Sequence, residues 1–183
     1  MSVCVLLAPG FEEIEAVTVI DVLRRADIDT VTLGVDGTDV IGSHGITLLA
    51  DALLSDRADE NWDMVVLPGG MPGSAHLRDA EAVQKLLKSQ RKRGAKTAAI
   101  CAAPIALSAA GLLEGRKATS YPAFAEQVAA AEYMTIPVVV DDDITTSRGP
   151  GTALEFALSL VEQLRGGDVA DDLASRMLVA PRF

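Results

Sequence analysis

The sequence predicts an α/β fold, a doubly wound and mostly parallel sheet with helices on both faces. Short runs that are apolar throughout, such as Val3–Ala8 and Met64–Leu67, are typical of strands buried on both sides. Stretches with apolar residues at helical spacing alternate with these runs along the chain. No internal repeat, low-complexity tract or obvious linker interrupts the sequence, so we expect a single domain over residues 1–183.

The first fifty residues predict a strand, a helix, a second strand and a hairpin. The helix begins with acidic residues, which suit the positive end of a helix dipole. Glycines punctuate the segment that follows the second strand, as in a small hairpin. In order, the expected elements are Val3–Ala8, which ends at Pro9-Gly10, then Glu12–Ala26, Thr30–Val35 and the hairpin Gly37–Ala50.

The middle of the chain repeats this alternation of strands and helices. One apolar strand ends in a Pro-Gly-Gly turn, and an amphipathic helix ends at a glycine. The expected elements are the strand Met64–Leu67 before Pro68-Gly69-Gly70, the helix Ala80–Arg93 before Gly94, the strand Thr97–Ile100 and a short helix that ends near Gly111.

The last third is patterned less clearly. We expect a strand at Lys117–Thr119, a helix at Phe124–Ala131, strands at Ile136–Val140 and Ile144–Thr146, an apolar helix at Gly151–Arg165 and a final helix. Three consecutive aspartates, Asp141–Asp143, separate the two later strands. We interpret them as a solvated hairpin turn in preference to a cation site.

The composition disfavours several classes of partner. Of the 183 residues, 49% are hydrophobic and 4% aromatic, so Ala, Val, Leu and Ile are expected to build the core. The net charge of −10 argues against a nucleic-acid or anionic-membrane partner. Val3–Ala8 is too short to span a bilayer, and we expect no signal peptide before it. Two cysteines, Cys4 and Cys101, cannot form a disulfide framework, so we expect a reducing, cytoplasmic location.

Cys101 lies where a predicted strand turns into a predicted helix. Ala99 and Ala103, two positions to either side, are the small residues that the tight turn of a nucleophile elbow requires. A thiol at this bend faces the amino end of a helix, whose partial positive charge favours the thiolate. This segment alone leaves open the alternative of a core cysteine on a buried strand. For Cys4, in the middle of a strand, we favour the buried structural role.

Three strand ends are expected to meet at one edge of the sheet. In parallel sheets, functional groups gather at the carboxyl ends of the strands. Here those ends are Pro9-Gly10 with the acidic helix start, Pro68–Gly70, and Cys101. The sequence therefore predicts one composite site.

Four motifs in this order resemble the ThiJ/PfpI superfamily, in the branch of the Parkinson's-linked protein deglycase and its bacterial relatives. They are Ala8-Pro-Gly-Phe-Glu-Glu-Ile-Glu-Ala16, Val66-Leu-Pro-Gly-Gly70, Ala98-Ala-Ile-Cys-Ala-Ala-Pro104 and Thr146-Ser-Arg-Gly-Pro-Gly-Thr152. The resemblance runs from Val3 to the final helix. It implies a flavodoxin-like fold of the class I glutamine amidotransferase type, an isologous homodimer and no cofactor or metal.

The resemblance also implies which residues act. It assigns the catalytic pair to Cys101 and Glu15, with Gly70 and Ala102 offering backbone amides to a developing oxyanion. Helix phase separates Glu15 from its neighbour Glu13, which is turned roughly 100° away. Glu12 shares the face of Glu15 and has a structural alternative as an acid at the helix start.

The catalytic pair predicts coupled titrations. An ionised carboxylate beside the sulfur would raise the pKa of Cys101, whereas a protonated Glu15 that donates a hydrogen bond would lower it. We therefore expect Glu15 to stay protonated near neutral pH and Cys101 to be substantially ionised, with the two titrations coupled.

Histidine is where the sequence departs from many relatives. Tyr121 stands at the position where relatives can have a histidine after the nucleophile, so a protease-type Cys-His dyad is not expected there. Candidate substrate-binding residues are Gly69, Tyr121 and His44, the last in a hairpin that in the family reaches toward the partner subunit's site. A solvated loop histidine is the simpler interpretation of His44, and His76 is expected to be structural or on the surface.

The resemblance implies a cofactor-independent deglycase or glyoxalase. Its substrates would be small α-oxoaldehydes such as methylglyoxal and glyoxal, or the proteins that these aldehydes glycate. The alternative is a non-enzymatic sensor of oxidative stress, or a chaperone, that uses the same oxidisable cysteine.

Overall fold

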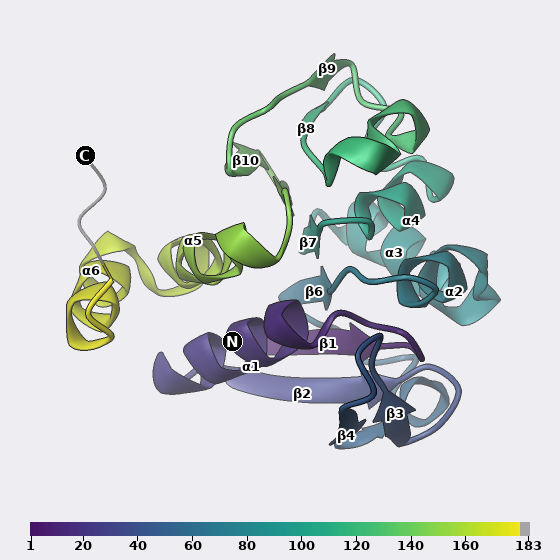
Figure 1. Ribbon diagram of the computed structural model, residues 1–183, viewed down its shortest axis with the longest axis horizontal. Coiled ribbons are helices and arrows are strands. Elements are labelled where there is room, and N and C mark those ends of the chain that lie inside the picture. The colour runs from purple at the N-terminus through teal and green to yellow at the C-terminus, as the bar shows by residue number, and fades with distance from the viewer. Residues whose placement is uncertain (180–183) are drawn as a thin grey trace.

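A seven-stranded sheet with the strand order β10-β11-β7-β6-β1-β2-β5 forms the centre of the computed structural model, which describes residues 1–179 (Figure 1). Neighbouring strands run parallel except for β10 and β11, which pair antiparallel. The strands are β1 (Ser2–Leu7), β2 (Asp29–Gly34), β5 (Ala52–Leu53), β6 (Met64–Leu67), β7 (Lys96–Ile100), β10 (Val138–Asp141) and β11 (Ile144–Ser147). This confirms the predicted doubly wound, flavodoxin-like α/β fold.

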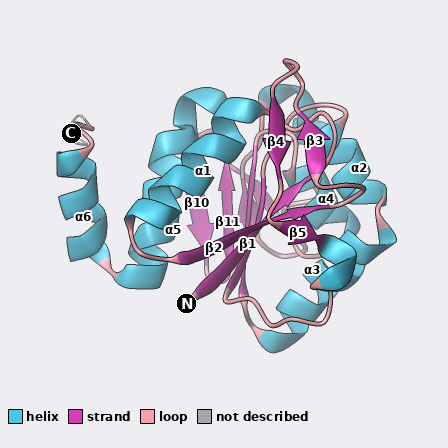
Figure 2. Ribbon diagram, turned by 90° about the horizontal axis from the view of Figure 1, so that it is seen from below, coloured by secondary structure: helices cyan, strands magenta, loops and turns pink. Residues whose placement is uncertain are grey.

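Helices cover both faces of the sheet (Figures 1 and 2). One face packs against α1 (Glu13–Arg25) and α5 (Ala153–Arg165), with α6 (Gly167–Arg176) on the outer side of α5. The other face packs against α2 (Gly73–Asp79), α3 (Glu81–Arg93) and α4 (Pro104–Ala109). Successive side chains of a strand point to opposite faces. This alternation explains why β1 is apolar throughout: Val3, Val5 and Leu7 enter the first core, and Cys4 and Leu6 enter the second.

Several smaller elements lie outside the seven-stranded sheet. A hairpin of β3 (Asp39–Ile41) and β4 (Thr47–Leu49) stands apart from it, as expected for Gly37–Ala50. The remaining elements are the pair β8 (Lys117–Ala118) and β9 (Glu132–Tyr133), and the 3-10 turns η1 (Leu54–Asp56), η2 (Pro122–Gln127) and η3 (Pro150–Thr152). The turn after β10 is confirmed, and Arg116 forms ion pairs with all three of its aspartates.

The predicted helix Phe124–Ala131 is wrong. The structure has only the 3-10 turn η2 there, which begins at Pro122 and contains no buried residue. A helix needs one continuous apolar face against a core to be stable, but here Phe124 packs against the first core and Val128 and Ala130 against the second. A short helix that the sequence pattern did not predict, α2, follows the turn at Gly69-Gly70.

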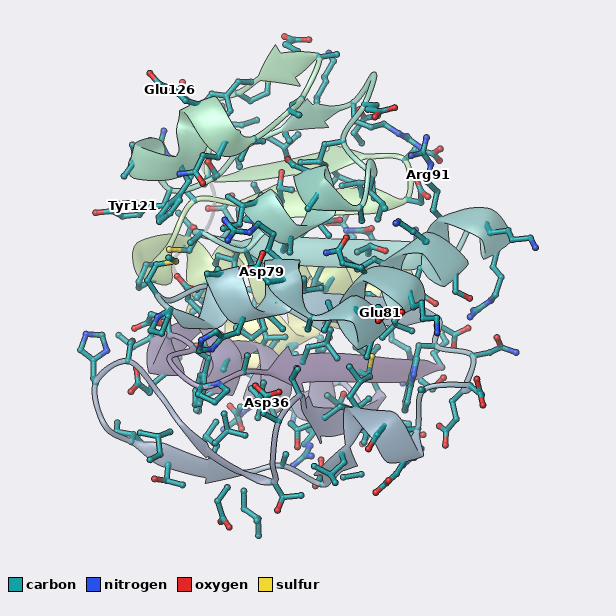
Figure 3. The ribbon with its side chains drawn as sticks, turned by 90° about the vertical axis from the view of Figure 1, so that its right-hand side faces the viewer. Asp36, Asp79, Glu81, Arg91, Tyr121 and Glu126 are labelled. Atoms are coloured by element: carbon teal, nitrogen blue, oxygen red, sulfur yellow. The ribbon has the colours of Figure 1, made fainter. Side chains whose placement is uncertain are left out.

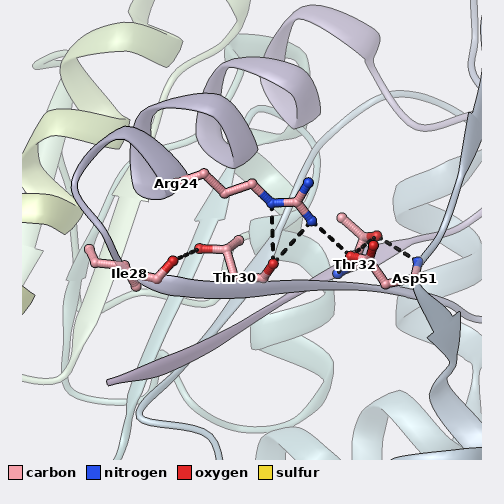
Figure 4. Close-up of polar contacts among 5 residues, drawn as sticks. All are labelled: Arg24, Ile28, Thr30, Thr32 and Asp51. Atoms are coloured by element: carbon pink, nitrogen blue, oxygen red, sulfur yellow. Dashed lines mark hydrogen bonds and ion pairs between the residues drawn. The ribbon is translucent and has the colours of Figure 1, made fainter.

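An ion-pair network fixes α1 to the edge of the sheet (Figure 4). Arg24 donates to the Thr30 carbonyl oxygen at 3.1 Å and to the Asp51 carboxylate at 2.8 Å. The backbone and hydroxyl of Thr32 also donate to Asp51. Burial alone would raise the pKa of Asp51, but the bonds from Thr32 and Arg24 outweigh it and lower that pKa. Within residues 1–179, no helix has the length and apolarity of a membrane span.

Candidate active site

Cys101 occupies the predicted elbow between β7 and α4. Its φ angle is +63°, a left-handed conformation that costs energy for any residue with a Cβ atom. Two hydrogen bonds hold this turn: the Cys101 N–H donates to the Ser147 carbonyl at 2.9 Å, and the Tyr121 N–H donates to the Cys101 carbonyl at 2.8 Å. The residue is 8% exposed, at the carboxyl end of the sheet. The strained turn is thus built to present the thiol.

Glu15 lies in the first turn of α1, with its side chain fully buried. Its Oε2 atom accepts the Gly69 N–H at 2.7 Å, whereas no group among the described residues donates to its Oε1 atom. A buried carboxylate oxygen without a donor disfavours the ionised form. Burial raises the pKa of Glu15 to about 7, in the direction that we expected.

The pKa of Cys101 departs from our expectation. Burial raises this pKa to about 12, and the nearby Glu15 carboxylate adds to the rise, while the backbone amides of Gly70 and Ala102 act against it. The expected ionisation of Cys101 is therefore corrected: a buried sulfur beside an ionised carboxylate keeps its proton. Glu15 raises the pKa of Cys101, whereas the hydrogen bond with Cys101 acts to lower the pKa of Glu15. The proton therefore stays on the sulfur while Glu15 is ionised, and thiolate character requires that Glu15 be protonated.

A glycine turn brings the two side chains together. Gly69 lies so close to both that a Cβ atom on it would be 2.5 Å from the Cys101 Cβ and from the Glu15 Oε2. Gly70 has a φ angle of +91°, and its α-carbon faces the backbone of residues 10–12 without room for a side chain. Only glycine fits both positions without strain. The amides of Gly70 and Ala102 face the sulfur, as an oxyanion site beside it requires.

Tyr121 is linked to the elbow by its backbone, but its ring lies outside. The side chain is 46% exposed, and Figure 3 shows it at the periphery of the molecule with the hydroxyl pointing outward. It lines a shallow pocket of about 230 Å³ with Pro122 and residues 148–152. Gly149 packs against the Tyr121 ring, so the pocket has an aromatic wall.

Neither histidine joins this group within one copy of the chain. The His44 Nδ1 atom lies 2.8 Å from Glu13 Oε2, and its side chain is 71% exposed. The His76 Nδ1 atom lies 3.0 Å from the Pro9 carbonyl oxygen, a structural contact at the surface as expected. Five of the seven candidate residues are thus brought together, namely Glu15, Gly69, Gly70, Cys101 and Ala102; Tyr121 borders them and His44 does not.

Comparison with known proteins places the chain in a family that accounts for both its fold and its motifs. Residues 1–163 match the sequence model of the DJ-1/PfpI family. The chain belongs to the DJ-1/PfpI family. This confirms the resemblance that the four sequence motifs suggested.

Relatives in the DJ-1/PfpI family align with nearly all of the chain. It is 45% identical over 184 residues to Protein DJ-1 homolog A of Arabidopsis thaliana, covering 98% of this chain but about half, 47%, of that longer protein. It is 34% identical over 181 residues to the Glutathione-independent glyoxalase DJR-1.2 of Caenorhabditis elegans, covering 98% and 97% of the two chains. The oxidized Toxoplasma gondii DJ-1 structure superposes with a TM-score of 0.95, at 42% identity, covering 98% and 99%.

Two features of this DJ-1/PfpI site were missed by sequence reasoning. The Thr146–Thr152 motif was recognised but given no role, and its Ser147 carbonyl proves to anchor the elbow. Glu13, identified only as turned away from Glu15, accepts several bonds from the hairpin. Together with Glu12 and His44 it forms, within residues 1–179, a set whose ligand atoms lie within 4.8 Å of one another, a spacing that suits a metal ion.

Proposed function

We propose that this chain is a cofactor-independent enzyme that converts α-oxoaldehydes such as methylglyoxal and glyoxal, or their protein adducts, into hydroxy acids. The observation that carries the proposal is the meeting of Cys101 and Glu15 across Gly69, with the amides of Gly70 and Ala102 facing the sulfur. A relative that is named a glutathione-independent glyoxalase supports it.

In the proposed reaction the Cys101 sulfur attacks the aldehyde carbon of the substrate. The thiol proton passes by way of Glu15 to the carbonyl oxygen, which gives a hemithioacetal. The amides of Gly70 and Ala102 stabilise the negative charge on this oxygen while it forms. A pKa of about 7 lets Glu15 accept and return a proton with little cost at neutral pH.

Glu15 then moves a proton between two carbons. Its carboxylate removes the hydrogen on the carbon bonded to sulfur, which leaves an enediol, and returns a proton to the adjacent carbon. The product is a thioester of a 2-hydroxy acid. Water hydrolyses this thioester and restores the Cys101 thiol, so methylglyoxal plus water becomes lactic acid without any oxidant or reductant.

The test is lactate production from methylglyoxal with EDTA present. Wild type and Cys4→Ala, a control that removes the other thiol, are expected to turn over. Cys101→Ser and Glu15→Ala are expected to lose activity by about a hundredfold or more. Full activity in Cys101→Ser would overturn the proposal. For glycated proteins, the same four proteins would be compared with a trap for free aldehyde present, because removal of free aldehyde can imitate deglycation.

A second candidate function is a sensor of oxidative stress. Cys101 is slightly exposed and lies beside two amides, and a solved relative is described as oxidized. Hydrogen peroxide would convert the thiol to a sulfenic acid and water, and a second equivalent would give a sulfinic acid. Peroxide oxidation of Cys101 in a protein without aldehyde turnover would favour this function. Protection of client proteins that survives Cys101→Ser would instead favour a chaperone.

We also propose that two copies form an isologous homodimer through α1 and the hairpin. Ile14 and Val17 on α1, and Ile46 and Leu49 on the hairpin, are exposed apolar side chains. A groove of about 270 Å³ runs between these elements. Sedimentation equilibrium should show a dimer that Val17→Glu dissociates and Lys85→Glu, on α3, does not. A monomeric wild type would contradict this assembly.

A further inference from the structure

The tip of the β3–β4 hairpin, residues 42–46, surrounds the carboxylate of Glu13. The Glu13 Oε1 atom accepts the His44 N–H at 2.6 Å and the Ile46 N–H at 3.4 Å. Its Oε2 atom accepts the Ser43 hydroxyl at 3.2 Å and lies 2.8 Å from His44 Nδ1. The Glu13 side chain is only 6% exposed, so its charge is met by the donors of the tip.

The tip also lies so close to Glu13 that position 42 has no room for a side chain. A Cβ atom on Gly42 would overlap the Glu13 side chain, its Cγ atom lying 2.7 Å away. Burial on its own would raise the pKa of Glu13, but the bonds from His44 and Ile46 outweigh it and lower that pKa to about 2. The carboxylate is therefore ionised at neutral pH, and it attracts the imidazole, whose own pKa it raises.

The other side of the tip rests on the loop that leads into α1. The Ser43 N–H donates to the Phe11 carbonyl at 2.8 Å, and the Gly10 N–H donates to the Ile41 carbonyl at 2.8 Å. The far side of this loop meets the glycine turn of the active site, where the Glu12 N–H donates to the Gly69 carbonyl at 2.9 Å. Residues 10–12 are thus a layer between the hairpin tip and the turn that contains Gly70.

We propose that Glu13 is a positioning residue that clamps the hairpin tip onto residues 10–12, and through them keeps the Gly70 amide in place beside Cys101. The clamp is a buried carboxylate with donors on both oxygens, and hydrogen bonds to charged groups are the stronger ones in proteins. Within residues 1–179, its loss would leave the backbone bonds of Ile41 and Ser43 as the hydrogen bonds between the hairpin and residues 10–12.

A bound metal is the competing interpretation of the same side chains. Glu12, Glu13 and His44 have suitable spacing. However, both oxygens of Glu13 already accept bonds from the tip, and Glu12 Oε2 accepts the Glu15 N–H at 2.8 Å as the N-cap of α1. A metal ion would have to displace bonds that the chain supplies itself, so the clamp is the better account.

The first test is hydrogen exchange on the full chain, which needs no activity. In Glu13→Ala the amides of His44 and Ile46 should exchange about tenfold faster or more, since each loses its hydrogen bond to a charged carboxylate. Glu13→Gln keeps one acceptor oxygen and should be intermediate. His44→Ala changes an exposed side chain, cannot threaten folding and should give a smaller increase. Thr47→Ala, on β4, is the matched control: it follows Ile46, but its exposed side chain makes no hydrogen bond to Glu13 among the described residues, so it should change nothing.

The second test is kinetic, and it rests on the proposed aldehyde reaction. Displacement of the Gly70 amide should lower kcat by about tenfold in Glu13→Ala and leave KM nearly unchanged, because an oxyanion donor acts mainly in the transition state. Glu13→Gln should recover part of the loss. A wild type without turnover would overturn the proposed function, and the exchange experiment would still decide the clamp.

Three results would overturn the clamp. One is unchanged exchange at His44 and Ile46 in Glu13→Ala. Another is a uniform rise in exchange over the whole chain with no effect of His44→Ala, which would show a merely structural role. The third is loosening of the wild-type tip by EDTA, reversed by Zn²⁺, which would show that a metal holds these side chains together.

Discussion

Glu15 and Cys101 meet across Gly69, whose amide binds the carboxylate and whose missing side chain makes room for both. The Gly69 N–H donates to Glu15 Oε2 at 2.7 Å, and a Cβ atom at this position would lie 2.5 Å from that oxygen and from the Cys101 Cβ. The distance between a residue of α1 and a residue after β7 is therefore set by a third residue, in the turn after β6.

Gly69→Ala should abolish activity. The added methyl group would also lie 2.9 Å from the Ile100 carbonyl oxygen, so either the elbow or Glu15 must move. Misplacement of reacting groups by about 1 Å can cost a hundredfold in rate, and we expect at least that loss in kcat/KM for methylglyoxal. Gly37→Ala is the control, because a Cβ atom there meets nothing within 4 Å. Equal activity of the two variants would contradict this geometry.

Glu15→Gln should lower the pKa of Cys101. The Glu15 carboxylate raises that pKa by its charge, and the substitution removes the charge while keeping a side chain that can donate to the sulfur. We expect a fall of about one pKa unit or more, and a smaller fall in Glu15→Ala, which offers no donor. The pH dependence of alkylation by iodoacetamide measures it, in a Cys4→Ala background. A higher pKa in Glu15→Gln would show that a protonated Glu15 normally stabilises the thiolate.

Much of the fold could be predicted because the strands are buried on both faces and read as unbroken apolar runs. The strand pattern also placed Cys101 at a strand end before a helix, where an elbow was one of two interpretations, and the family motifs decided between them. The predicted helix at Phe124–Ala131 is wrong because its apolar residues pack against two different cores, and so form no single helical face. The contact that Ser147 makes with the elbow could not be predicted, because it depends on tertiary structure that no local pattern records. Gly69 was expected at the site, but not its hydrogen bond to Glu15.

The pKa of Cys101 could not be predicted from the sequence for a different reason. The family resemblance identified both members of the pair, but no pattern in the sequence indicated how deeply the fold buries them. Exclusion from water penalises either charge, and only one proton is available to relieve the two groups. Which atom holds that proton depends on the amides of Gly69, Gly70 and Ala102, whose directions are set by backbone conformation.

The elbow should store measurable strain. A non-glycine residue with a φ angle of +63° is strained by about 1 kcal/mol, which glycine would not bear. Cys101→Gly should therefore be at least as stable as Cys101→Ala in urea, although glycine normally destabilises by its greater freedom in the unfolded chain. Ala99→Gly, in the regular strand β7, should show the ordinary loss. A Cys101→Gly protein that is clearly less stable than Cys101→Ala would show an unstrained turn.

The buried carboxyl of Glu15 should make the protein less stable as pH rises. Between its ordinary pKa of 4.5 and the folded value of about 7, the folded chain binds more protons than the unfolded chain, so the free energy of unfolding must fall across this range. The maximal loss is about 3 kcal/mol, from 1.36 kcal/mol for each pKa unit.

Glu15→Gln separates this effect from every other titration, because the amide imitates the protonated acid and does not ionise. Urea unfolding of both proteins from pH 5 to pH 8 should give similar stabilities at pH 5, and a stability advantage of the variant that grows up to about pH 7 and then levels off. His44 and the other titrating groups are common to both proteins, so they cancel in the difference. A difference that does not change with pH would mean that Glu15 is ionised throughout, and its Oε1 atom would then need a donor that the fold does not provide.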